Sequence, residues 1–122
     1  MATQALANWT VSLTTLPEEV TRTALSPFSG PPTSTLLGSS ITIDAQHAGL
    51  FNGIASHVHD YDDTHPDTII HPPGAVASAL LAITETLARP VSGREFLLAL
   101  VAGIEAECKV GKAVWPAHHD VG

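Results

Sequence analysis

Apolar residues recur at intervals of three and four along most of this chain, which is the spacing of one face of an α-helix. The pattern predicts helices over 2–13, from Ala45 to about Val58, over 75–87, and from 93 to about 112, with a short helix after Thr15. In the two middle helices the apolar residues that lie close to one face are Ala48, Phe51, Ile54, Ala55 and Val58, and the later helix has an apolar stripe of Val76, Leu80, Ile83 and Leu87. The chain is therefore expected to be mostly α.

Capping residues support these boundaries. Thr15 and Ser92 are each followed three residues later by a glutamate, and Asp44 precedes the helix that begins at Ala45. At the N-cap, the position just before a helix, a side-chain oxygen accepts a hydrogen bond from a free backbone N–H of the first turn. Within the last helix, small residues at neighbouring positions favour close approach of a second helix; they are Ala99, Ala102, Gly103 and Ala106.

Prolines and glycines divide the helical segments. The run from Ser26 to Pro32 contains three prolines and ends the short helix, because proline cannot donate the helical hydrogen bond. Residues 35–43 read as a small β-hairpin around Gly38. A chain of 122 residues is long enough for one domain. We therefore expect a single, mostly α domain with at most a small hairpin near residues 35–43.

Charge excludes several function classes. The net charge is −7 and only five residues are Lys or Arg, so phosphate neutralisation on nucleic acid or binding to an anionic membrane is not expected. No apolar run reaches the roughly 20 residues of a membrane span, and no signal peptide is visible. We expect a cytoplasmic protein, with a mitochondrial location as the alternative. The single cysteine, Cys108, cannot form an intrachain disulfide and reads as a small buried apolar residue.

Residues 57–71 carry four of the seven histidines together with the acidic run from Asp60 to Asp63. Imidazole and carboxylate side chains together can move protons near neutral pH. If the helix continues through Asp63, then Asp60 and Asp63 lie on one side and Thr64 lies one turn beyond Asp60. His71 would then fold back from the proline-rich loop to face them, which makes a proton-transfer site.

Two other interpretations of this cluster remain. His57, His59 and the aspartates are metal-ligand types, but His57 and His59 lie on different sides of a helix and cannot chelate together there. The spacing also fails as a calcium loop, because His65 stands where that loop needs glycine. In the third interpretation the aspartates only cap helices and the histidines are surface residues.

The same residues resemble a known signature. Asn52-Gly, His57, Asp60-Tyr-Asp-Asp-Thr-His65 and His71-Pro-Pro-Gly-Ala75 are similar to the central motif of the MmgE/PrpD family. Leu16-Pro-Glu-Glu-Val20 and the segment 92–105 resemble helices on either side of that motif, so nearly the whole chain is covered. The resemblance implies part of a large all-helical domain, which in the family is closed by a smaller α+β lid domain.

The resemblance also implies a chemistry. Family members act on small di- and tricarboxylates by moving a proton next to a carboxylate, without a metal or organic cofactor. Dehydration of a 2-methylcitrate-like acid is our first expectation, with decarboxylation of cis-aconitate or epimerisation as alternatives. By resemblance Asp60, Thr64 and His71 are catalytic: His71 as acid or base, Asp60 orienting it or the substrate, and Thr64 bonding a substrate oxygen. Asp63 and His65 are expected to bind substrate.

The chain departs from the family pattern in two places. After Leu25 the proline-rich run replaces an apolar helix, and the sequence stops at Gly122 before the lid domain and the lysines of the family pocket. We therefore expect residues 1–122 to form a single, incomplete helical domain that lacks the C-terminal lid. This supports a hypothesis of another class, a non-catalytic helical module that needs a partner. The expected partner is a second copy or the missing C-terminal portion.

Overall fold

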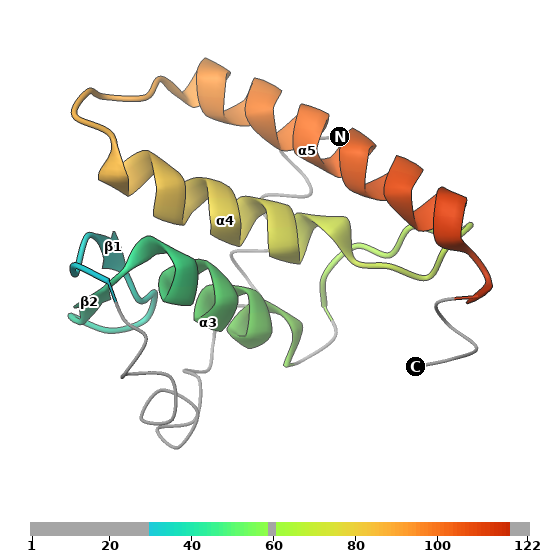
Figure 1. Ribbon diagram of the computed structural model, residues 1–122, viewed down its shortest axis with the longest axis horizontal. Coiled ribbons are helices and arrows are strands. Elements are labelled where there is room, and N and C mark those ends of the chain that lie inside the picture. The colour runs from blue at the N-terminus through green and yellow to red at the C-terminus, as the bar shows by residue number, and fades with distance from the viewer. Residues whose placement is uncertain (1–29, 59–60, 118–122) are drawn as a thin grey trace.

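The computed structural model describes residues 30–58 and 61–117, and these form a small hairpin followed by three helices. The helices are α3 (Ala45–His57), α4 (Pro72–Thr86) and α5 (Gly93–Val114). In Figure 1, α4 runs between α3 and α5, and the hairpin lies beside α3. The expected mostly α class with a small hairpin is confirmed. The helices predicted over 2–13 and after Thr15 lie outside the described residues.

The hairpin consists of β1 (Ser34–Thr35) and β2 (Thr42–Ile43), paired antiparallel with Ser34 opposite Ile43. Its loop closes through a hydrogen bond from the Leu36 N–H to the Ile41 carbonyl at 2.9 Å. Gly38 has φ 81°, which is the left-handed conformation that glycine adopts without steric cost. The predicted turn around Gly38 is therefore confirmed.

Buried polar side chains fasten the hairpin to the helices. The Asn52 amide of α3 accepts from the Leu37 N–H and donates to the Thr35 carbonyl, each at 3.0 Å. The Ser34 hydroxyl donates to the Ala82 carbonyl of α4 at 2.8 Å. Asn52 is only 1% exposed, so its hydrogen bonds satisfy backbone groups that water cannot reach. Two helices and the hairpin are thereby held as one unit.

Helix α3 begins where the sequence predicts, but it buries a different face. Asp44 is the N-cap, and its side chain accepts from the His47 N–H at 3.1 Å. The buried residues are His47, Ala48, Phe51, Asn52, Ala55 and Ser56. Ile54 is 46% exposed and Val58 is 55% exposed, so the apolar face that the spacing indicates is buried only in part. The polar Asn52 and Ser56 take part of that face because each has an internal hydrogen-bond partner.

Small residues bring α3 and α4 close together. A Cβ added at Gly49 would lie 3.5 Å from the Ala79 Cα, and Ala48, Ala55 and Ala77 are almost completely buried. The core between these helices therefore rests on close backbone approach more than on large side chains.

Helix α4 starts three residues earlier than predicted, at Pro72. Pro72 and Pro73 occupy its first two positions, where the missing N–H groups would have no helical partner. At its other end the predicted stripe fails, because Ile83 is 54% exposed and Leu87 is 43% exposed. The start could not be read from apolar spacing, since the first turn is buried through two prolines and Gly74.

Helix α5 has the predicted capping box, with Ser92 and Glu95 each bonding the other's backbone N–H. Of the four small residues predicted to favour close approach, Gly103 meets Val76 of α4, whereas the three alanines are exposed. Its outer surface carries exposed large apolar residues, namely Leu98, Val101, Val110 and Val114. No helix in the described ranges is long and apolar enough to span a membrane.

Candidate functional site

The loop between α3 and α4 folds the histidine-rich segment back on itself. His65 and Ile70 form an isolated antiparallel bridge, with the His65 N–H donating to the Ile70 carbonyl at 2.8 Å. Between them Ile69 has φ 55°, a conformation that is strained for a β-branched residue. This reversal delivers His71 to the N-cap of α4, next to the end of α3. His71 therefore folds back as predicted, but it faces Asp62 and not Asp63, and Asp60 lies outside the described residues.

Asp62 lies at the centre of the side chains that the loop gathers. Its side chain is 1% exposed, and its two oxygens lie 3.1 and 3.3 Å from Nδ1 of His57, the last residue of α3. Nδ1 of His71 lies 3.5 Å from Oδ2 of Asp62. The two imidazole rings are 4.6 Å apart between centroids. One buried carboxylate is thus shared by two imidazoles.

A cavity of about 800 Å³ opens beside these three residues, between α3 and α4. His57, Asp62 and His71 supply its ionisable lining. The remaining wall is mostly small or apolar, and includes Gly49, Leu50, Ile54, Ala79 and Ile83. A reactive polar group at the edge of an otherwise apolar cavity is the usual form of a small-molecule site.

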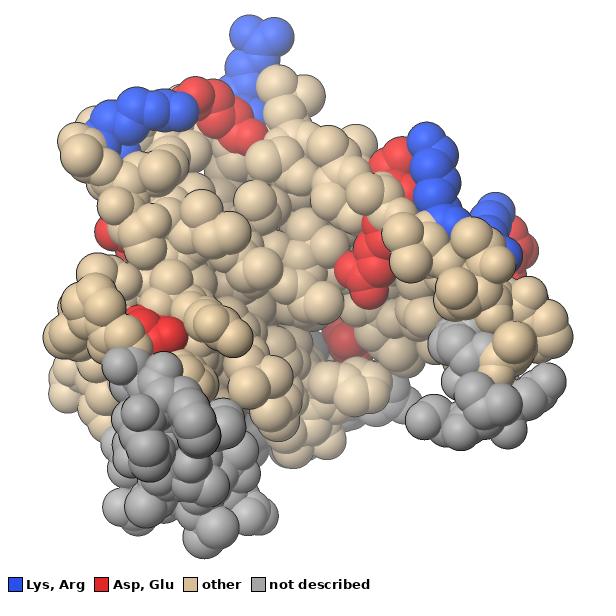
Figure 2. All heavy atoms as spheres, viewed as in Figure 1, with Lys and Arg blue, Asp and Glu red and all other residues tan. Residues whose placement is uncertain are grey.

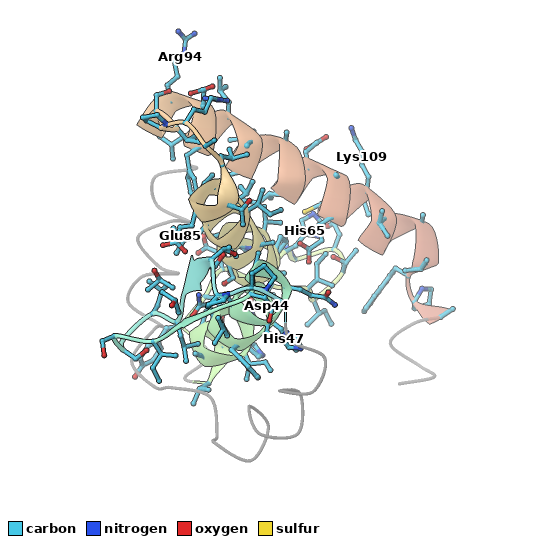
Figure 3. All side chains as sticks on the ribbon, turned by 60° about the vertical axis from the view of Figure 1, so that its left-hand side comes forward. Asp44, His47, His65, Glu85, Arg94 and Lys109 are labelled. Atoms are coloured by element: carbon cyan, nitrogen blue, oxygen red, sulfur yellow. The ribbon has the colours of Figure 1, made fainter. Side chains whose placement is uncertain are left out.

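A second cavity, of about 540 Å³, lies on the other side of this loop against α5. Asp63, Thr64 and His65 line it together with Cys108 and Glu105 of α5. Figure 3 shows His65 beside α5. Burial raises the pKa of the Cys108 thiol, an effect that Glu107 and Glu105 reinforce, so the thiol stays protonated near neutral pH.

The structure therefore divides the residues that the sequence grouped together. His71 lines the first cavity, whereas Asp63, Thr64 and His65 line the second, and Thr64 is exposed. Asp60 lies outside the described residues. The expected arrangement on one continued helix is wrong for the described part of the run, because α3 ends at His57 and residues 61–64 are not helical. The catalytic and binding roles assigned to these residues stay predictions.

Sequence reasoning missed the two partners of His71. Nothing in the sequence separates Asp62 from the other aspartates of the acidic run, and His57 was considered only as a metal-ligand type, a surface residue or part of the family-like motif. The only signal was their place within the family-like motif, because neither apolar spacing nor charge shows which aspartate of a run becomes buried.

The three residues could also hold a metal ion. The donor atoms of His57, Asp62 and His71 all lie within 4.8 Å of one another, and they are ligand types that zinc accepts. The same distances are those of imidazole–carboxylate hydrogen bonds and ion pairs, which is how we interpret them.

The lysines and arginines that the structure describes lie away from this site. Neither cavity is lined by a lysine or arginine within the described ranges. Figure 3 shows Arg94 and Lys109 projecting outward from α5, and Figure 2 shows the Lys and Arg side chains at the rim of a mostly uncharged face. Lys112 pairs with Asp67 at 2.8 Å, and this pairing lowers the pKa of Asp67. A polyanionic substrate would need further cationic groups.

Comparison with known proteins decides the family. The profile of the MmgE/PrpD N-terminal domain matches residues 3–121. The chain belongs to the MmgE/PrpD family. This confirms the resemblance read from the sequence motif.

Three relatives of the family illustrate the similarity. The cis-aconitate decarboxylase of Homo sapiens is 42% identical over 84 residues, which cover 66% of this chain and 17% of that protein. The Mus musculus cis-aconitate decarboxylase is 39% identical over 84 residues, which again cover 66% of this chain and 17% of that protein. The Aspergillus terreus cis-aconitate decarboxylase is 26% identical over 91 residues, covering 72% of this chain and 19% of its own length. The chain thus spans less than a fifth of these relatives, and no solved structure matches it significantly.

Proposed function

We propose that this chain supplies the proton-transfer part of a lyase that acts on a citrate-type di- or tricarboxylate. The observation that carries the proposal is His71, a half-buried imidazole placed 3.5 Å from the buried Asp62 carboxylate on the wall of an 800 Å³ cavity. Family membership and the similarity to cis-aconitate decarboxylases support the substrate class.

In the proposed mechanism His71 moves a proton at carbon next to a substrate carboxylate. In a dehydration, the imidazole accepts the C–H proton, the electron pair forms the double bond, and the hydroxyl leaves as water after taking a second proton. In a decarboxylation, the C–C bond breaks, carbon dioxide leaves, and the electron pair left on carbon takes a proton from the imidazolium. A positioned acid or base of this kind contributes about 10²–10⁴-fold in rate.

Decarboxylation is the variant that the relatives favour, since the three described above carry that name. Dehydration of an alkylcitrate remains the second candidate, because it also needs a proton moved at carbon next to a substrate carboxylate. Epimerisation is the third, and it differs in returning the proton to the same carbon. These reactions are separated by product: released carbon dioxide, an unsaturated acid of equal carbon count, or an isomer of unchanged mass.

The 122 residues would provide one portion of the helical domain, with cationic groups for the substrate coming from elsewhere. The lining of the cavity supports this, because it carries Asp62 and no described lysine or arginine. An acidic wall repels a polyanion unless positive charge offsets it.

The test is turnover of cis-aconitate, citrate and an alkylcitrate by the purified chain, followed by carbon dioxide release and product analysis. His71→Ala should lose about 10²–10⁴-fold in rate. The matched control is His47→Gln, because His47 pairs with Asp44 and does not line the cavity. If His71→Ala turns over substrate as fast as the parent chain, His71 is not the proton-transfer residue.

A further inference from the structure

We propose that Asp62 is a positioning residue, a buried carboxylate that fixes the ring orientation and tautomer of both His57 and His71. Its catalytic consequence rests on the proposed function, but the tautomer it imposes is a property of the folded chain. The argument depends on how Asp62 is held, on the state of the His71 ring, and on the number of acceptor atoms that a carboxylate offers.

Asp62 is held firmly although it lies in a loop. A Cβ added at Gly74, in the first turn of α4, would lie 3.5 Å from Oδ2 of Asp62 and 2.8 Å from the Ser56 hydroxyl. The Asp62 carboxylate therefore lies close to the backbone of α4 at Gly74, where the Ser56 hydroxyl leaves no room for a larger residue. The positive end of the α4 dipole lies at the same turn and favours a negative charge there. A carboxylate so enclosed makes a fixed reference point for neighbouring rings.

His71 presents a buried nitrogen to this carboxylate. Its Nδ1 is inaccessible to solvent and makes no hydrogen bond to any residue that the structure describes, and the Asp62 oxygen lies 3.5 Å away. A buried donor without a partner costs about 1–3 kcal/mol. A small movement of the ring toward Asp62 removes that cost, and catalytic hydrogen bonds often tighten in this way when substrate binds.

The chemistry of the carboxylate then sets the tautomer. An ionised carboxylate only accepts hydrogen bonds, so an imidazole Nδ1 facing it must carry the proton. The His71 side chain is 24% exposed although its Nδ1 is buried, so its exposure comes from other atoms of the side chain, and the residue lines the cavity. Nε2 is then left as the basic nitrogen of His71, available to a substrate.

His57 is the second ring on the same carboxylate. It currently makes the shorter contacts, at 3.1 and 3.3 Å, and its side chain is 54% exposed and able to turn away. A carboxylate offers two acceptor oxygens, one for each ring, whereas an amide offers one oxygen and two donor hydrogens. Replacement by asparagine must therefore change the tautomer of at least one ring while keeping the shape of the side chain.

The experiment is ¹⁵N NMR of the histidine ring nitrogens in the 122-residue chain, at a pH where the rings are neutral. In the parent chain we expect His57 and His71 to carry the proton on Nδ1. In Asp62→Ala both should shift to the Nε2–H form that isolated imidazole side chains prefer. In Asp62→Asn at least one ring should shift.

An internal control lies in the same spectrum. His47 pairs with Asp44 at 2.6 Å, away from this cavity, so its signals should not respond to changes at Asp62. Conversely, Asp44→Ala should change the His47 signals and leave His57 and His71 unaltered. Unchanged His57 and His71 tautomers in both Asp62 variants, with His47 signals showing an intact fold, would overturn the inference.

Turnover separates this inference from the proposed function. With substrate, Asp62→Asn should lower kcat by about 10²-fold while KM changes little, because a misplaced base mainly weakens the transition state. If the tautomers respond as expected but neither the parent chain nor any variant turns over a carboxylate, the positioning role stands and the proposed function fails for the 122-residue chain on its own. If turnover depends on His71 but the His57 and His71 tautomers do not change when Asp62 is replaced, the proposed function stands and the positioning role fails.

Discussion

At the residue scale, the chain uses the aspartate–histidine pair for two purposes. Asp44 and His47 lie one turn apart at the start of α3, with side chains 11% and 10% exposed, and their contact of 2.6 Å closes a helix cap. Asp62 meets His57 and His71 from different elements, and it lies on a cavity wall. Asp44 hydrogen-bonds the His47 ring and the His47 backbone N–H. In the group around Asp62, each imidazole ring faces the carboxylate with Nδ1, which leaves the other ring nitrogen available. The same residue types are therefore structural in one place and candidates for chemistry in the other.

The Asp44 cap leads to a prediction about stability and pH. Burial acts to raise the pKa of Asp44, but hydrogen bonds from the His47 ring and N–H outweigh it, and the pKa is lowered. A carboxyl with a lowered folded-state pKa stabilises the fold above its unfolded value of about 3.9, and that contribution is lost as pH falls further. We expect Asp44→Ala to lose about 0.5–2 kcal/mol in urea unfolding at pH 7, with a smaller difference from the parent below about pH 3.9.

Asp44→Asn is the control for this measurement, because asparagine caps helices about as well as aspartate but carries no charge. It should retain most of the stability at pH 7 and lose the part that depends on pH in this range. An Asp44→Ala penalty that is the same at every pH would show that the charge plays no part in the cap.

At the element scale, the arrangement depends on how closely α4 approaches its neighbours. A Cβ added at Gly103 would lie 2.5 Å from Cγ1 of Val76, and the β-branched Val76 has little rotamer freedom in a helix. The first turn of α4 is limited in the same way by Gly74 against Ser56. The Gly74–Ser56 contact limits where His71, the N-cap of α4, lies relative to the end of α3, and the Gly103–Val76 contact sets the distance between α4 and α5.

Gly103→Ala tests this close approach. Overpacking of this kind costs about 1–3 kcal/mol, so the variant should unfold at lower urea concentration than the parent. The matched change is Gly93→Ala at the exposed start of α5, where an added Cβ meets nothing within 4 Å. That variant should be neutral or stabilised by about 0.4–1 kcal/mol, because alanine lowers the conformational entropy of the unfolded chain. Equal effects at the two positions would mean that α4 and α5 can separate without cost.

The same elements show what sequence could predict. The hairpin, the Asp44 cap and the capping box at Ser92 were predicted, because each depends on neighbouring residues and on local backbone geometry. The buried face of α3 and the early start of α4 were not predicted, because residues distant in sequence bury Asn52 and Pro72. The sequence predicted the segment that carries the candidate site, and His71 belongs to that segment. Asp62 and His57 were missed, since only the reversal at Ile69 decides which side chains meet.

At the scale of the whole molecule, the described part of the chain leaves much apolar surface uncovered. Leu98 and Val101 of α5 are 61% and 50% exposed and lie one turn apart, and the cavity wall exposes Leu50, Ile54 and Ile83. Contiguous apolar surface on a small protein usually marks contact with another chain or domain. This agrees with a chain that spans 17% to 19% of its relatives.

We therefore expect the purified 122-residue chain to self-associate, with a mass by light scattering that rises above 12.7 kDa as concentration increases. The double variant Leu98→Lys, Val101→Lys should shift the mass toward the monomer, because two charges on that face resist desolvation at a contact. The control is Thr86→Lys, an exposed residue at the end of α4 that adds charge away from the α5 face. A parent chain that stays at 12.7 kDa at every concentration would show that this face does not bind a second copy. If the parent chain associates and the double lysine variant associates equally well, the contact lies on another surface. The apolar cavity wall beside His57 and His71 would then be the next surface to test by substitution.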